Sequence, residues 1–186
     1  MRIIAGEYRS RKIETRSGNQ TRPTLDKVRE AVFSSLGGMF DGGTVLDLYA
    51  GSGANGLEAL SRGYDYAVFA DISKDAINII RKNIESLRCQ EKTKIFHMPD
   101  KKILSLLKAE GLRFDLVYLD PPYAGQHNNE ILEYLQENNM ITDHGVVVIE
   151  SAKEDEFKKE FGSLKPYKEA TYGITRITYY RNEVEG

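Results

Sequence analysis

The sequence predicts an α/β protein built on a doubly wound, mostly parallel sheet. Three observations predict it: short apolar runs alternate with helical patterns, a glycine-rich turn follows the first central run, and acidic residues stand where several runs end. Strands that are apolar throughout are typical of parallel sheets covered on both faces. Their alternation with helices implies right-handed crossovers. We therefore expect five parallel strands followed by a C-terminal antiparallel hairpin.

The N-terminal segment differs in charge from the rest of the chain. Residues 1–29 hold eight Lys and Arg against three Asp and Glu, a net charge of +5, whereas the whole chain carries −2. Residues 2–6 and 11–15 each have the pattern of a short strand, so a basic β-hairpin is expected there. A basic segment on an acidic body suggests an anionic partner, with a solvated basic face as the alternative.

The remaining elements follow in chain order from their periodicity. Thr24 is suited to cap a helix whose apolar stripe ends at Gly37-Gly38, and Ser73 is suited to cap another. Beyond the first helix, β-branched and aromatic runs predict strands and the stretches between them predict helices. The expected strands are 44–49, 66–71, 93–98, 114–120 and 145–150, the helices are 53–62, 73–88, 103–109 and 130–138, and the hairpin is 167–172 with 174–181.

Composition excludes several classes of protein. The single cysteine, Cys89, permits no intramolecular disulfide, and the three histidines do not have the spacing of zinc ligands. No apolar run approaches the roughly 20 residues of a membrane span. We expect a cytoplasmic monomer that binds no metal and no membrane, with an extension at 1–23 and one larger domain at 24–186.

The glycine-rich turn predicts a nucleotide cofactor. Gly51, Gly53 and Gly56 join the first central strand to the next helix, where backbone and free N–H groups can approach a ligand closely. Asp71 ends the following strand, where an acid can bind both ribose hydroxyls. A nicotinamide dinucleotide and S-adenosylmethionine (AdoMet) both fit this pattern. Asp47 is placed near the amino-acid head of AdoMet, and Asp100 lies where adenine could be held.

The segment Asp120-Pro121-Pro122-Tyr123 favours AdoMet. It follows a strand directly, and its prolines hold the chain extended while donating no N–H. Asp120 and nearby carbonyls can accept the hydrogens of an exocyclic base amine and orient its lone pair toward a methyl group. Tyr123 can stack on the base. A dehydrogenase has no evident use for this tetrapeptide.

These motifs resemble the class I AdoMet-dependent methyltransferases that modify amino groups on nucleobases. With Arg2-Ile-Ile-Ala-Gly and Thr21-Arg-Pro-Thr included, nearly the whole chain is similar to the bacterial RsmD family, which methylates the N2 amine of one guanine in 16S rRNA. The resemblance implies a seven-stranded Rossmann-like sheet and a substrate in the 30S subunit or its precursor. It implies AdoMet contacts from Asp47, Tyr49, Gly51, Gly53, Asp71, Ile72 and Asp100, methyl transfer at Asp120, Pro121, Pro122 and Tyr123, and RNA contacts from Arg9, Arg11, Lys12 and Arg22.

Three alternatives stay open at this stage. Asp120-Pro121-Pro122-Tyr123 also suits adenine-N6 methylation of DNA or RNA, although 186 residues leave no room for a separate target-recognition domain. A non-catalytic RNA-binding module with a methyltransferase fold is a second alternative, disfavoured by the intact Asp47, Asp71 and Asp120. A nicotinamide oxidoreductase is suggested only by the glycines. The family often has Asp-Ala after the third strand, whereas this chain has Pro99-Asp100.

Overall fold

The computed structural model describes residues 1–16, 22–158 and 160–184. They belong to two compact units, Met1–Asp100 and Lys101–Gly186. The first unit holds α1 (Arg22–Ser35), β1 (Thr44–Asp47), α2 (Ala54–Ser61), β2 (Tyr66–Asp71), α3 (Lys74–Leu87), the 3-10 turn η1 (Gln90–Lys92) and β3 (Thr93–His97). The second holds α4 (Asp100–Ala109), which starts at the boundary, β4 (Phe114–Leu119), α5 (Asn128–Glu137), β5 (Ile141–Ala152), β6 (Leu164–Tyr172) and β7 (Thr175–Asn182).

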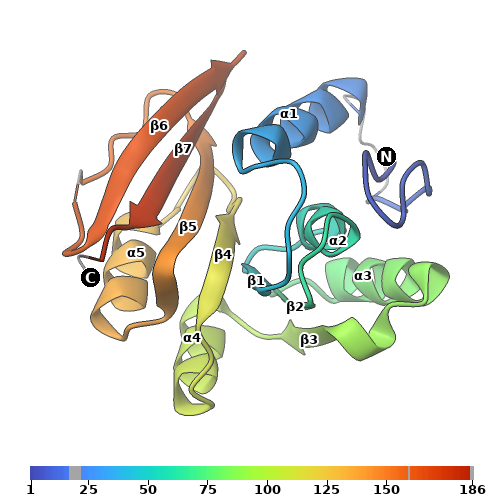
Figure 1. The fold of residues 1–186 in the computed structure, drawn as a ribbon, viewed down its shortest axis with the longest axis horizontal. Coiled ribbons are helices and arrows are strands. Elements are labelled where there is room, and N and C mark those ends of the chain that lie inside the picture. Colours follow the sequence, from blue (N-terminus) through green and yellow to red (C-terminus); the bar gives the residue numbers. More distant parts are fainter. Residues whose placement is uncertain (17–21, 159, 185–186) are drawn as a thin grey trace. The chain divides into compact units, whose positions relative to one another are not determined.

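The first unit is built on three parallel strands in the order β3-β2-β1. Thr44 pairs with Tyr66, and Ala67 pairs with Thr93. Helix α2 packs on β1 and β2, and α3 packs on β2 and β3, beside which it lies in Figure 1. Val68 and Phe69 at the centre of β2 are completely buried, and the Phe69 ring lies against Gly56 of α2. The carboxyl ends of β1 and β2 therefore carry the loops that the sequence marked as cofactor-binding.

The second unit is built on four strands in the order β4-β5-β7-β6. Strands β4 and β5 are parallel, whereas β7 runs antiparallel to both β5 and β6, as Figure 1 shows. Thr175, the first residue of β7, pairs with Ala152 at the carboxyl end of β5. The β6–β7 turn thus lies at the edge of this sheet where β4 and β5 end. Gly173, with φ of 61°, makes that turn.

The predicted pattern of parallel strands and a C-terminal antiparallel hairpin is confirmed, although several elements differ from their predicted bounds. Strand β5 begins at Ile141 rather than residue 145, because Ile141 pairs with Phe114 ahead of a register shift. Helix α1 begins at residue 22 instead of 24. The N-terminal hairpin is reduced to one antiparallel bridge, between Arg2 and Lys12. The backbone N–H groups just after this bridge are bonded to a side chain of α2 instead of to a partner strand.

That side chain is Glu58, which anchors the N-terminal arm, defined here as residues 1–16. Glu58 is fully buried in α2, and its two carboxylate oxygens accept hydrogen bonds from the backbone N–H groups of Ile4 (3.0 Å) and Ala5 (3.2 Å). They also accept from Nε of Arg29 (3.1 Å) and Nε of Arg62 (2.8 Å), both buried. A buried carboxylate is tolerable only with such partners. Glu58 therefore joins the arm, α1 and the end of α2.

The arm also approaches the last residue of α2 very closely. The backbone N–H of Glu7 donates to the Ser61 carbonyl at 2.8 Å, and that of Tyr8 donates to Ser61 Oγ at 2.9 Å. Gly6 lies between these contacts and the Glu58 contacts, with φ of 88°. A Cβ placed on Gly6 would lie 1.8 Å from the Ser61 carbonyl oxygen. Only glycine permits this close approach.

We expect Gly6→Ala to release the arm from α2. The added methyl collides with backbone and the positive φ disfavours alanine, and together these effects cost about 1–3 kcal/mol. Trypsin should then cleave after Arg9, Arg11 or Lys12 several-fold faster than in the wild-type protein. Gly173→Ala is the matched control, since its φ is also positive but its Cβ would meet nothing within 4 Å. Equal cleavage rates for Gly6→Ala and wild type would contradict the docked arm.

Candidate active site

The glycine-rich turn is shaped by two left-handed glycines and one packed glycine. Gly51 and Gly53 have φ of 59° and 83°. Gly56 lies against Phe69, whose ring would be 2.3 Å from an added Cβ. Asp47 at the end of β1 is buried, and its Oδ2 accepts a hydrogen bond from the Gly56 N–H at 3.0 Å. The turn is thus held by a carboxylate from the strand before it.

Asp71 connects this turn to the end of β2. Its Oδ2 accepts from the Gly51 N–H at 2.9 Å, and its Oδ1 accepts from the Ser73 N–H at 2.9 Å. Each carboxylate oxygen has two lone pairs, so both oxygens retain capacity for further donors. Asp71 is only partly buried. It is therefore positioned by the backbone and suited to accept from a pair of neighbouring hydroxyls.

Tyr49 and Asp100 form a second link between loops of the first unit. The Tyr49 hydroxyl donates to Asp100 Oδ2 at 2.6 Å. Burial, and then the bond to Asp100, raise the pKa of the Tyr49 phenol, so it stays protonated. Ile72 is 71% exposed directly after Asp71, and its carbonyl lies 3.0 Å from His97 Nε2. All seven residues predicted to contact AdoMet lie in the first unit, at the carboxyl ends of β1 and β2 or between the end of a strand and the start of the next helix.

The four residues predicted for methyl transfer lie in the second unit, directly after β4. Pro121 is buried, whereas Tyr123 is 38% exposed. The Tyr123 hydroxyl shares a 2.6 Å hydrogen bond with Thr175 Oγ1. Burial raises the pKa of Tyr123, the bond to Thr175 lowers it, and the charges of Asp120, Glu150 and Asp155 raise it further. Tyr123 is therefore a neutral phenol with acidic side chains around it.

Thr175 and Glu150 both interact with Tyr123, and neither was predicted from the sequence. Glu150 lies near the end of β5 and accepts a hydrogen bond from the Tyr118 hydroxyl at 2.5 Å. Thr175 comes from β7, 52 residues beyond Tyr123. The only available signals were a polar residue at the end of an apolar strand and a threonine that opens the last strand. Neither marks a site without the pairing of β5 with β7.

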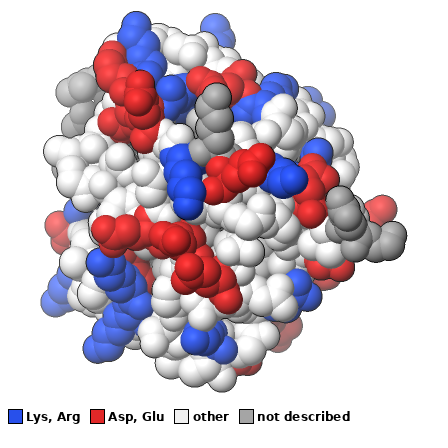
Figure 2. Space-filling view, turned by 90° about the vertical axis from the view of Figure 1, so that its left-hand side faces the viewer, with Lys and Arg blue, Asp and Glu red and all other residues white. Residues whose placement is uncertain are grey.

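The predicted RNA-contact residues are described in part. Arg9, Arg11 and Lys12 are exposed on the N-terminal arm. One guanidinium nitrogen of Arg11 donates to the Ser86 carbonyl at 2.8 Å, so this residue also helps to hold the arm. The side chain of Arg22 lies outside the described residues. In contrast to the arm, the face of β6 and α5 carries interspersed acidic and basic side chains (Figure 2).

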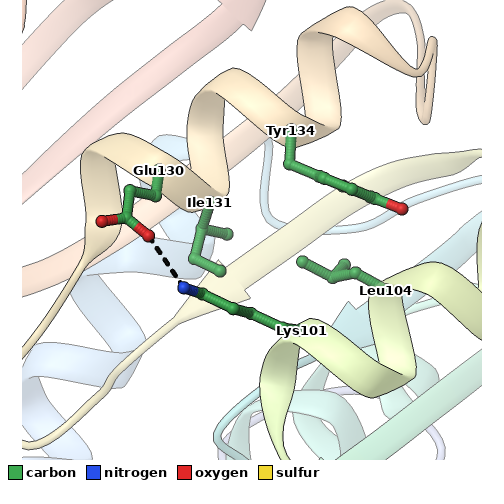
Figure 3. A pocket seen from close by; sticks show the side chains of 5 residues that line it. All are labelled: Lys101, Leu104, Glu130, Ile131 and Tyr134. Carbon is green, nitrogen blue, oxygen red and sulfur yellow. Dashed lines mark ion pairs between the residues drawn. The ribbon is translucent and has the colours of Figure 1, made fainter.

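A pocket of about 210 Å³ lies between α4 and α5. Leu104 of α4 and Ile131 of α5 line it with apolar surface, and Tyr134 of α5 lies across from Leu104 (Figure 3). Lys101 and Glu130 close one side with a 3.0 Å ion pair, although both side chains are largely exposed. The pocket contains none of the predicted site residues.

Two further properties concern the residues that the structure describes. Among residues 1–16, 22–158 and 160–184, no group of three or more His, Cys, Asp or Glu is arranged to hold a metal ion. Within the same ranges, no helix combines the length and the apolar character that crossing a membrane requires.

Solved structures place the fold in the class I methyltransferases. The Escherichia coli protein yhhF, 28% identical, superimposes with a TM-score of 0.83 over 100% of this chain and 99% of its own. SMU.776, whose structure is described as complexed with SAH, has a TM-score of 0.61 over 85% of this chain and 49% of its own, and at 14% identity it supports the fold alone. The predicted fold class is confirmed by these likenesses.

The family is shown by sequence. The family described as "Conserved hypothetical protein 95" matches residues 1–181, and the chain belongs to it. The YlbH protein of Bacillus subtilis is 35% identical over 97% of this chain and 98% of its own length. The protein named "Ribosomal RNA small subunit methyltransferase D" from Haemophilus influenzae is 32% identical over 98% of this chain and 94% of its own. The resemblance to the RsmD family is thereby confirmed.

Proposed function

We propose that the protein transfers a methyl group from AdoMet to the N2 amine of a guanine in the 16S rRNA of the small ribosomal subunit. One observation carries the proposal. This member of the family combines the segment Asp120 to Tyr123, which suits an exocyclic base amine, with a glycine-rich turn whose Gly51 N–H is hydrogen-bonded to Asp71. The relative named for small-subunit rRNA supports the choice of substrate.

The residues of the first unit fit AdoMet. Space is open at Gly51, where an added Cβ would meet nothing within 4 Å, so a ligand can approach the backbone there. Asp71, which accepts from the Gly51 N–H, would also accept from the two ribose hydroxyls, and exposed Ile72 would offer apolar surface to adenine. Asp47 and Gly53 would lie toward the methionine part, and Asp100 with Tyr49 toward the base. When bound, AdoMet supplies an electrophilic methyl carbon on a positively charged sulfur.

The residues after β4 would bind the target base. Asp120 accepts hydrogens of the exocyclic amine and so directs its lone pair at the methyl carbon, while Pro121 and Pro122 keep the segment rigid. Asp120 would hold the proton that the amine loses when AdoMet, once bound, supplies its methyl group. Positioning of this kind supplies roughly 7–11 kcal/mol.

The choice of guanine N2 over adenine N6 follows from the resemblance to the RsmD family, because the segment Asp120 to Tyr123 suits either amine. The charges of Asp120, Glu150 and Asp155 raise the pKa of Tyr123, so the phenol stays neutral beside either base.

The test is transfer of labelled methyl from AdoMet to 30S particles that lack the modification, followed by mapping of the methylated nucleoside. We expect N2-methylguanosine in 16S rRNA. N6-methyladenosine instead would replace the proposed substrate by the adenine alternative. Absence of transfer to 30S particles, to naked rRNA and to DNA would favour a binding module with this fold.

We further propose that the extension at 1–23 binds rRNA phosphates, since Arg9 and Lys12 are exposed on the docked arm. Arg9→Ala with Lys12→Ala should weaken binding to 30S particles and reduce the slope of log affinity against log salt by about 2, because each lost phosphate contact removes about 1. AdoMet affinity should not change. Lys108→Ala, an exposed lysine of α4, is the control. An unchanged slope would mean that Arg9 and Lys12 are solvated surface residues that do not contact rRNA phosphates.

A further inference from the structure

The hydrogen bond between Tyr123 and Thr175 joins two parts of the second unit that are far apart in sequence. Thr175 opens β7 and is fixed on both sides, by pairing with Ala152 of β5 and with Tyr172 of β6. Tyr123 lies instead on the loop between β4 and α5. The 2.6 Å bond therefore ties a loop side chain to a rigid sheet.

The turn beside Thr175 exposes an apolar side chain. Ile174 is 72% exposed, and its carbonyl accepts a hydrogen bond from the Lys153 N–H at 3.1 Å. Gly173, with its positive φ, reverses the chain before it. The backbone of the tip is thus held on both strands and against the end of β5, so Ile174 is presented to solvent in a fixed place. Ile174 is thus an exposed apolar side chain directly before Thr175, the residue that bonds to the partly exposed Tyr123.

An exposed tyrosine on a loop has several rotamers, and stacking requires one ring orientation. Base–aromatic stacking contributes about 1–3 kcal/mol per base, and that contribution is reduced when the ring must be ordered first. Thr175 removes this cost by holding the phenol at its far end. The neutral state of Tyr123 keeps the hydrogen bond intact at physiological pH.

We propose that the β6–β7 tip, residues 172–175, is part of the surface that receives the target nucleobase: Thr175 positions the Tyr123 ring, and Ile174 supplies an apolar contact to the unstacked base or its neighbour. The ligand class is a nucleobase of RNA that has left its stack. This inference rests on the proposed methyl transfer to rRNA. Thr175 is a positioning residue, because it acts through Tyr123.

The inference predicts a division between kcat and KM. Binding of the 30S particle as a whole depends on many phosphate contacts, whereas placement of one base takes place within the complex. Thr175→Val should therefore lower kcat about tenfold or more and leave KM for 30S particles within about twofold. Thr175→Ser retains the hydroxyl and should restore kcat to within about twofold of wild type. Ile174→Asp should lower kcat as well, and Ile174→Leu should not.

Controls separate a positioning role from general damage. Thr171→Val, an exposed position on β6, should leave kcat unchanged, and AdoMet affinity measured by calorimetry should be equal in all variants. NMR of ring-labelled tyrosine should show faster Tyr123 ring motion in Thr175→Val only. Wild-type kinetics in Thr175→Val, or failure of Thr175→Ser to restore kcat, overturns the inference while the proposed function stands. Absence of transfer by the wild-type protein overturns both.

Discussion

Asp120→Ala is expected to lower methyl transfer to rRNA by at least about 100-fold while AdoMet affinity stays within about twofold. Loss of one preorganised polar group that acts at the reacting atoms typically costs 10²–10³ in rate. Asp120 is proposed to accept the amine hydrogens, so its removal leaves the lone pair undirected and the departing proton without an acceptor. Labelled AdoMet with 30S particles measures the rate, and calorimetry measures the affinity.

Three variants make this result specific. Asp120→Asn keeps one acceptor oxygen, and should therefore retain more activity than Asp120→Ala. Asp71→Ala should lose AdoMet binding, because its carboxylate is the proposed ribose acceptor and also holds the Gly51 N–H. Asp143→Ala removes an exposed carboxylate 3.7 Å from Arg113 and should change neither quantity. Equal loss of AdoMet affinity in Asp120→Ala and Asp71→Ala would contradict the role given to Asp120.

The fold, and the positions of Asp71 and Asp120 at strand ends, were predictable because they depend on local patterns. Apolar runs mark buried strands directly, and a residue that follows such a run must lie at the carboxyl edge of a parallel sheet. This places Asp71 and Asp120 at strand ends without any knowledge of the packing. Gly51 and Gly53 were recognisable from the glycine-rich pattern that follows the first central strand, and both adopt the left-handed conformation.

Contacts between distant segments were not predictable. The Thr175 bond to Tyr123 depends on the register of β7 against β5, and no residue pattern encodes a register between strands that are not adjacent in sequence. The reduced N-terminal hairpin has a similar cause. Residues 2–6 have the residue pattern of a strand, but the backbone N–H groups of Ile4 and Ala5 donate to Glu58, more than 50 residues away, instead of to a partner strand. Glu58 lies within the predicted helix 53–62, and the sequence pattern carries no sign of this contact.

Glu58→Ala is expected to lower the free energy of unfolding by about 3–5 kcal/mol, the usual cost of removing one partner from a buried ion pair. Arg29 and Arg62 would remain buried without their shared carboxylate, and two backbone N–H groups of the arm would lose their acceptor. Urea unfolding measures the change. Glu85→Ala, an exposed glutamate of α3, should stay within about 0.5 kcal/mol of wild type.

Hydrogen exchange distinguishes the two consequences of losing Glu58. Amide protection of Ile4 and Ala5 should fall in both Glu58→Ala and Glu58→Gln if the carboxylate holds the arm by accepting at both oxygens, because glutamine offers one acceptor oxygen where glutamate offers two. The arginines have other acceptors: Arg29 bonds to Asp26 at 3.1 Å, and Arg62 bonds to Glu30 at 2.9 Å. A loss below about 1 kcal/mol for Glu58→Ala would mean that these acceptors suffice. The alternative outcome has two parts: Glu58→Ala loses about 3 kcal/mol or more of its free energy of unfolding, and in Glu58→Gln faster amide exchange is confined to the arm. Together they would establish that both core stability and the presentation of Arg9 and Lys12 depend on Glu58.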